Sequence, residues 1–363
     1  MTSRVNLDSL EFTRQQASSR QQKLAFNSDT MVDAKAWQRK LRTNIVRLIG
    51  GMPRDRVPLS ARIVGQDDFS DYHRETILFN SRDNLTVFAY FLMPKGVDST
   101  VPAIVCCPGH GRGCDDIVGI EEDGSLRESP GGYQNDFALQ AVRHGFAALA
   151  IEPLGFGHRR DETARNGGAA TSSCQPAAGA ALLLGETMVG WRVYDVIRSL
   201  DYLQTRPEVD PKRLGCMGIS DGGTTTFFAS ALDRRIKASL VSGYFNSFQD
   251  SIFSIPHCID NYVPGILNVG EMSDVAGLIA PRPLFVESGT RDPIFPVAAT
   301  LIAFDRARKI YDVFDARDRL GIEIFEGDHR FHGVKGFSFL KKWLYHNTAI
   351  RQQQHKDLED ACR

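Results

Sequence analysis

The sequence predicts an α/β fold built on a mostly parallel, doubly wound sheet. Short apolar runs alternate with longer runs of helical spacing through most of the 363 residues. An earlier stretch alternates polar and apolar side chains, which is typical of antiparallel strands in a mixed sheet. Two long segments, residues 109–135 and 153–186, are rich in small and charged residues and fit no regular element. Such segments usually form binding walls at the carboxyl ends of parallel strands.

The first half of the chain supplies a helix and then strands. Two polar segments of helical spacing open the sequence, and the second, residues 31–48, ends at Gly50-Gly51. We expect strands at 75–79, 86–93, 102–107 and 146–151, with a helix at 137–144. The third of these strands is nearly all apolar, as a strand covered on both faces requires.

The second half alternates strands with helices, which is the pattern of parallel crossover units. Strands are expected at 213–219, 236–241, 283–286 and 322–325, and helices at 188–205, 222–232, 298–311 and 336–345.

The composition is that of an ordinary globular protein, with 42% hydrophobic and 24% charged residues. The 43 Lys and Arg residues nearly balance the 44 Asp and Glu residues, which argues against nucleic-acid and membrane partners. No apolar run is long enough for a membrane span or a signal peptide, so we expect a cytoplasmic protein. The seven cysteines form no Cys-x-x-Cys pair, and reduced thiols are expected. A homo-oligomer is compatible with these features.

One short motif carries the strongest chemical signal. Gly218-Ile219-Ser220-Asp221-Gly222-Gly223 lies between an apolar strand and a helix, the context of a G-x-S-x-G nucleophile elbow. Such a sharp turn crowds the backbone, so Gly218 and Gly222 stand where side chains would clash. Ser220 is therefore the predicted nucleophile, and the alternative is a plain glycine-serine loop.

A serine nucleophile needs a base and an acid that orients the base. In this strand-turn-helix context the acid and then the histidine follow the serine along the chain. Asp292 and His329 each follow a predicted strand and are the predicted acid and base. The alternatives are a turn role for Asp292 and a loop role for His329, with His332 as the rival base.

An oxyanion hole is expected where Pro108-Gly109-His110-Gly111 follows a buried strand. We predict that the backbone amides of His110 and Asp221 form it. The glycines around His110 do not complete a dinucleotide fingerprint, because Cys114 takes the third glycine position. His329-x-x-His332 lies on a loop without further ligands, so neither a metal nor another cofactor is expected.

Together these motifs resemble the acetyl xylan esterase and dienelactone hydrolase-like branch of the α/β hydrolases. The resemblance covers about residues 35–347 and includes the motifs around His110 and Ser220, together with Ala280-Pro281-Arg282-Pro283 and Gly289-Thr290-Arg291-Asp292-Pro293. It implies the α/β-hydrolase fold and the same triad, Ser220, Asp292 and His329. The predicted organisation is a helical N-terminal extension (1–60), one catalytic domain (61–347) and a polar tail (348–363). Relatives commonly have a small residue before the histidine, whereas here it is Asp328.

The expected function is hydrolysis of carboxylic esters with a small acyl group, through an acyl-enzyme. The resemblance and the polar loops both favour acetyl, since the one apolar run, residues 180–184, is short for a lipase-type lid. Hydrolysis of lactone, amide or C–C bonds by the same triad stays open. A non-catalytic binding protein and a nucleotide-dependent oxidoreductase are the alternatives from other classes.

Overall fold

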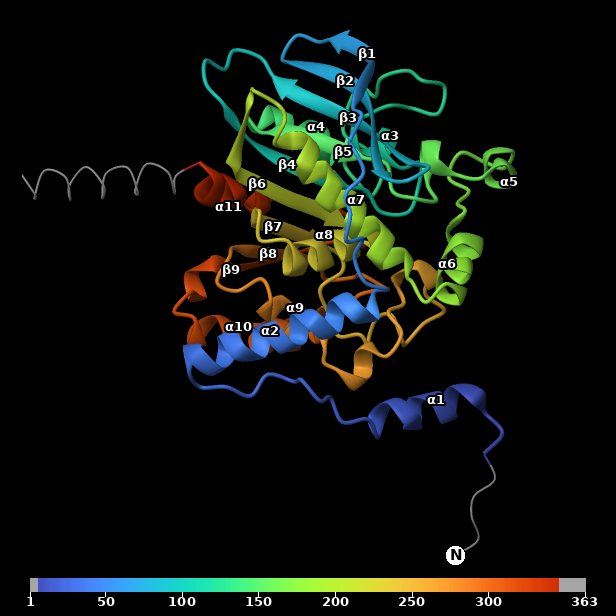
Figure 1. Cartoon of the computed structure of the whole chain (residues 1–363), viewed down its shortest axis with the longest axis vertical. Coiled ribbons are helices and arrows are strands. Elements are labelled where there is room, and N and C mark those ends of the chain that lie inside the picture. Colours follow the sequence, from blue (N-terminus) through green and yellow to red (C-terminus); the bar gives the residue numbers. More distant parts are fainter. Residues whose placement is uncertain (1–5, 346–363) are drawn as a thin grey trace, which may run out of the picture.

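A computed structural model describes residues 6–345 of the chain. One nine-stranded sheet forms its centre, with the strand order β1-β2-β3-β5-β4-β6-β7-β8-β9 (Figure 1). β1, β2, β3 and β5 pair antiparallel in that order, and the remaining pairs, from β5–β4 to β8–β9, are parallel. The strands are β1 Arg62–Asp68, β2 Tyr72–Arg82, β3 Leu85–Pro94, β4 Val101–Cys107, β5 Ala147–Ile151, β6 Val209–Ile219, β7 Ile236–Ser242, β8 Leu284–Gly289 and β9 Leu320–Phe325.

Helices cover both faces of this sheet (Figure 1). The α-helices are α1 Ser9–Ser18, α2 Met31–Leu48, α3 Cys114–Ile117, α4 Phe137–Arg143, α5 Glu162–Arg165, α6 Cys174–Leu183, α7 Met188–Leu203, α8 Asp221–Leu232, α9 Met272–Gly277, α10 Val297–Val313 and α11 Val334–Leu344. Short 3-10 helices are η1 Gly157–Arg159, η2 Ile259–Asn261, η3 Ile266–Asn268 and η4 Arg317–Arg319. The predicted mixed, mostly parallel α/β architecture is confirmed.

The strand period of two divides the core into two layers. In β4, Val105 and Cys107 face the layer of α2, α7, α8, α9 and α10. Ile104 and Cys106 face the opposite layer, with α3, α4 and α11. All of β4 is buried, as its uninterrupted apolar sequence predicts.

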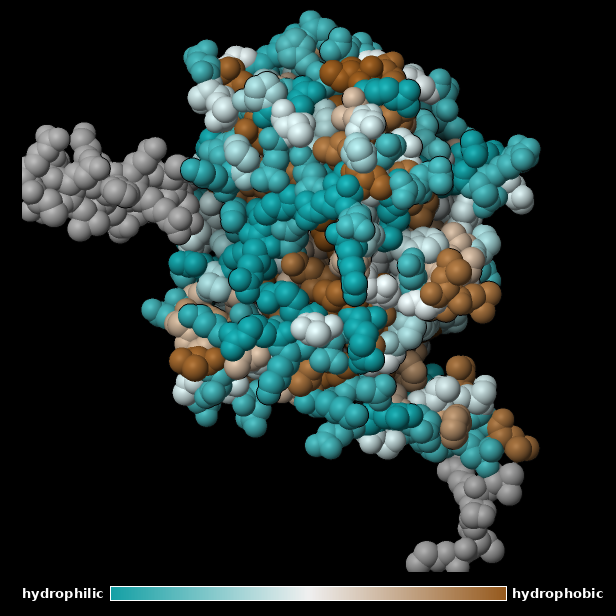
Figure 2. All heavy atoms as spheres, viewed as in Figure 1, coloured by the Kyte–Doolittle hydropathy of each residue, from teal (hydrophilic) through white to brown (hydrophobic). Residues whose placement is uncertain are grey.

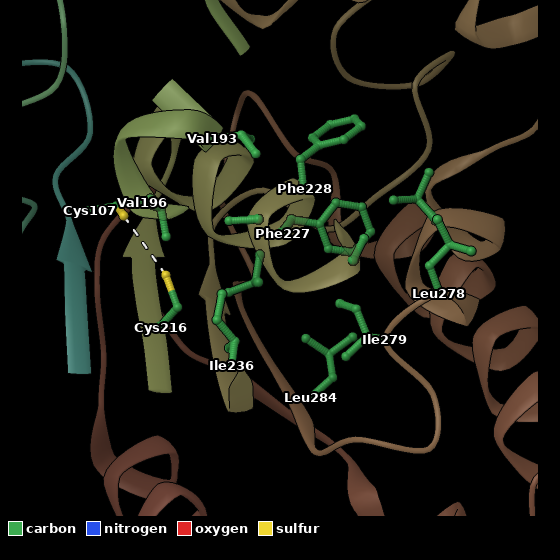
Figure 3. Packing of buried hydrophobic residues seen from close by; sticks show 14 of the residues in the cluster. Cys107, Val193, Val196, Cys216, Phe227, Phe228, Ile236, Leu278, Ile279 and Leu284 are labelled. Atoms are coloured by element: carbon green, nitrogen blue, oxygen red, sulfur yellow. Dashed lines mark hydrogen bonds between the residues drawn. The ribbon is translucent and has the colours of Figure 1, made fainter. Parts of the chain in front are cut away.

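Helix α8 begins at the carboxyl end of β6 and packs against one face of the sheet. Phe227 and Phe228 are fully buried and lie with Ile279 and Leu284 in one apolar cluster (Figure 3). Burial of a phenylalanine side chain typically contributes about 1.5–3 kcal/mol. The start of α8, directly after Ser220, is therefore held in a fixed position relative to the strands.

The sequence-based element assignments fail mainly outside the parallel core. β1 was not predicted, and its exposed pattern offers no continuous apolar face. The two predicted loops contain α3, and then η1, α5 and α6. In α6 the alanine-rich run favours a helix, and Pro176 is tolerated because it lies in the first turn.

The helices of residues 6–345 include none with the length and apolarity that a membrane crossing needs. Apolar side chains nevertheless gather on the surface at α6, where Leu183 and Leu184 are exposed (Figure 2).

Candidate active site

Ser220 occupies a sharp turn between β6 and α8. Its φ of 57° and ψ of −123° lie in a region that side chains rarely adopt. A Cβ at Gly218 would overlap the carbonyl oxygen of Gly222, and one at Gly222 would overlap that of Cys107. The predicted need for glycine at both positions is therefore confirmed, and the turn is a strained strand-to-helix elbow.

Asp292 and His329 form a hydrogen-bonded pair at the same edge of the sheet. Nδ1 of His329 donates to Oδ2 of Asp292 over 2.7 Å, and the carboxylate is almost fully buried. Oδ1 of Asp292 accepts the amides of Ile294 (2.8 Å) and Phe295 (3.0 Å), which fixes the orientation of the carboxylate. The other ring nitrogen of His329, Nε2, is buried and has no partner among the described residues.

The two rival residues point elsewhere. Asp328 is largely exposed, and its Oδ1 accepts from Nε of Arg291 at 3.1 Å. The second carboxylate next to the histidine in sequence is therefore turned away from the imidazole. His332 stacks on Phe325 with ring centroids 4.4 Å apart, and its Nε2 lies 3.7 Å from Glu323.

Three further residues shape the space around the imidazole, and none of them was predicted. Gly243 has a φ of 51°, and a Cβ there would lie 2.9 Å from Cε1 of His329. The rings of Tyr133 and Phe295 stack against His329 at centroid distances of 5.6 Å and 5.8 Å. The one feature of the sequence that could have indicated this role of Gly243 is its position directly after the apolar strand β7.

The turn that follows β4 is braced against the serine elbow. Gln134 accepts the amide of Gly109 at 2.7 Å, and the hydroxyl of Tyr133 donates to the carbonyl of His110 at 2.5 Å. A Cβ at Gly109 would lie 3.0 Å from Cβ of Ser220. Within residues 6–345, the backbone amides of His110 and Asp221 donate no hydrogen bond to another protein group.

A buried charge network lies behind the elbow. Nη1 of Arg192 donates to Asp221 at 2.5 Å and to Asp260 at 2.9 Å, with all three side chains almost fully buried. Burial opposes ionisation here, yet the positive charge of Arg192 holds the pKa of Asp260 well below its usual range. One feature of the sequence could have indicated this network. Arg192 is a charged residue on the apolar face of its helix, between Val189 and Val196.

Two buried glutamates support the loops of the site. Glu287 on β8 accepts the amides of Gly333 (2.8 Å) and His332 (3.3 Å), just beyond the histidine. Glu152, after β5, accepts the amides of Cys114 and His158, both at 3.1 Å. Burial raises the pKa of each carboxyl to about 7.

An apolar cavity of about 740 Å³ lies between α1, α6 and the segment 248–268. Phe248, Ile252 and Val263 line it, and His257 stands at its wall. The ring of His257 is 5.9 Å from that of Phe295, which in turn stacks on His329. The segment 248–268 was not expected to contribute to the site, because it contains little regular structure.

Comparison with known proteins relates this architecture to hydrolases. The "Putative hydrolase YtaP" of Bacillus subtilis (strain 168) is 29% identical over 313 residues, which are 84% of this chain and 98% of that protein. The structure is similar to that of a "putative acetyl xylan esterase" from Bacteroides fragilis NCTC 9343, with a TM-score of 0.76 and 17% identity over 97% of this chain and 95% of the other. It is also similar to a CE15 glucuronoyl esterase from Caldicellulosiruptor kristjansonii, with a TM-score of 0.60 and 17% identity over 87% and 86% of the two chains.

The structural likenesses, at such low identity, show the fold. The sequence itself matches the family described as the Abhydrolase family over residues 7–306. The chain belongs to this family of α/β hydrolases.

Proposed function

We propose that the protein hydrolyses carboxylic esters with Ser220 as nucleophile, His329 as base and Asp292 as the orienting acid. The hydrogen bond of 2.7 Å between His329 and Asp292 carries this proposal. It leaves Nε2 of the imidazole without a hydrogen-bond partner among residues 6–345, and Ser220 lies in a strained turn directly after β6.

In the proposed reaction, Oγ of Ser220 attacks the ester carbonyl while Nε2 of His329 accepts the hydroxyl proton. The amides of His110 and Asp221 donate to the oxyanion. Asp292 stabilises the imidazolium, which then gives its proton to the departing alcohol. Water attacks the acyl-enzyme by the same path in reverse and regenerates Ser220.

Labelling with a fluorophosphonate probe tests the nucleophile. We expect one phosphonylated site per chain in the wild type and none in Ser220→Ala. Ser288→Ala is the matched control, because Ser288 is also buried but lies within β8 rather than at an elbow. Labelling that persists in Ser220→Ala would contradict the assignment.

We further propose a small acyl group, most simply acetyl, with a larger alcohol. The predominance of small and polar residues in segments 109–135 and 153–186 supports this, as do the names of two structural neighbours as acetyl xylan esterases. Each buried methylene contributes about 0.8 kcal/mol, so an enzyme with an acyl tunnel gains activity as the chain grows.

The expected pattern is a fall in kcat/KM beyond about four acyl carbons, measured on p-nitrophenyl acetate through octanoate, because steric exclusion outweighs burial. A maximum at octanoate would refute the small-acyl proposal and would assign the acyl chain to an apolar space such as the cavity beside His257.

A further inference from the structure

Four side chains with metal-binding groups converge behind the turn of His110. One ligand atom from each of His110, Cys174, Cys258 and Asp260 lies within 4.8 Å of the others. Nε2 of His110 and Oδ2 of Asp260 are 3.5 Å apart. A tetrahedral zinc site with bonds of 2.0–2.3 Å has ligand-to-ligand edges of about 3.3–3.8 Å, so small side-chain movements would complete this geometry.

We propose that these four residues bind one Zn²⁺ ion per chain. Two cysteine sulfurs, one imidazole nitrogen and one carboxylate oxygen form a donor set that favours zinc over the hard cations Mg²⁺ and Ca²⁺. All four positions come from the protein, so the site is closed and of the structural type.

A poorly satisfied polar atom lies at this position. Nε2 of His110 is buried and makes no hydrogen bond among residues 6–345, and its ion-pair contact with Oδ2 of Asp260 is a long one of 3.5 Å. A buried nitrogen without a hydrogen bond is costly, and a bond to a metal ion would remove that cost. Cys174 is buried and Cys258 is half-buried, so the cluster is enclosed on one side and open to entry on the other.

Neighbouring hydrogen bonds already orient the proposed ligands. Nη2 of Arg192 donates to Sγ of Cys174 at 3.1 Å, and Nδ2 of Asn261 donates to Oδ1 of Asp260 at 2.9 Å. Such outer contacts are typical of metal sites, where they fix the ligating atoms.

The site would join three segments that are distant in sequence. His110 follows β4, Cys174 begins α6, and Cys258 and Asp260 lie at η2, in the connection between β7 and α9. Zinc would therefore position the turn of His110 and close α6 over it. All four coordination positions of the zinc would be taken by protein atoms, so the metal would not bind substrate. Its role would be to hold these three segments in place.

Cobalt binding tests the proposal without reference to activity. Full-length protein, reduced and freed of metal by a chelator, is titrated with Co²⁺ and then with competing Zn²⁺. We expect one Co²⁺ per chain, with thiolate-to-cobalt charge-transfer absorption and the intense visible bands of tetrahedral cobalt, both removed by Zn²⁺.

The variants Cys174→Ser and Cys258→Ser should lose these bands and bind more than about 100-fold more weakly, since even outer contacts contribute 10- to 100-fold. Cys258 is only half-buried, so its replacement should preserve the fold, as a thermal melt will check. Cys114→Ser is the control, because this cysteine is buried but lies in a separate cluster with Glu152 and His158.

Three results would overturn the proposal. These are no bound metal in the wild type, unchanged bands in both cysteine variants, and a Cys174–Cys258 disulfide in freshly purified protein by non-reducing peptide mapping.

Discussion

Gly243 lies directly against the imidazole of His329, so close that a Cβ would stand 2.9 Å from Cε1 and 3.1 Å from Nδ1. Its φ of 51° also disfavours any side chain. The end of β7 thus sets the position of the histidine, although it contributes no chemical group.

Gly243→Ala should therefore displace the imidazole and lower kcat/KM by about 100-fold, since a shift of about 1 Å in a catalytic group has that effect. Gly96→Ala is the matched control, because Gly96 has a φ of 70° and open space around it. Both variants should lose stability in thermal melts, but Gly96→Ala should keep its activity. Equal activity in the two variants would contradict the steric argument.

Replacing the carboxylates separates Asp292 from Asp328. Asp292→Asn should reduce kcat by about 10⁴-fold, because the amide favours the wrong imidazole tautomer. Asp328→Asn should change kcat less than about threefold, since this exposed side chain forms a surface ion pair with Arg291. Comparable losses in the two variants would show that the acid is misassigned.

The histidines are distinguished in the same way. His329→Ala should lose about 10⁶-fold in kcat, as triad bases do. His332→Ala removes a ring that stacks on Phe325 outside the pair with Asp292, so its activity should stay close to that of the wild type. An inactive His332→Ala together with an active His329→Ala would show that His332, and not His329, is the base.

Glu287 should make stability depend on pH. Burial raises its pKa from 4.5 to about 7, so the folded state binds a proton more tightly than the unfolded state does. Its stabilising contribution is therefore complete below about pH 4.5 and is lost as pH rises to about 7. The shift corresponds to on the order of 3 kcal/mol.

Urea unfolding of the wild type and Glu287→Gln between pH 4.5 and 8 measures this effect. The wild type should lose stability relative to the variant as pH rises, because the glutamine does not titrate. Parallel stability curves for the two proteins would rule out this titration.

The parallel core and the elbow could be predicted because their signals are local. A buried strand requires a short run of apolar residues, and the sharp turn at Ser220 requires glycines beside it. Both requirements can be seen within a few neighbouring residues. The pairing of Asp292 with His329 followed from chain order, and the structure bears out that pairing.

The remaining features form where residues that are distant in sequence meet in the fold. The spacing of apolar residues along the chain does not show which residues will meet. Arg192, Asp221 and Asp260 meet from a helix, an elbow and a loop, and only the charge on an apolar helix face hinted at this. Gly243 lies near no other site residue in sequence. The four proposed zinc ligands span residues 110–260 without a recognisable spacing.

Turnover of p-nitrophenyl acetate by Ser220→Ala shows whether Ser220 is the nucleophile. Circular dichroism and the thermal melt should match those of the wild type, with Ser288→Ala run in parallel as an active control. We expect kcat to fall by about 10⁶-fold, as for other triad nucleophiles. A folded Ser220→Ala protein that keeps more than about one per cent of wild-type kcat would contradict it, since such a loss is far below that of a triad nucleophile.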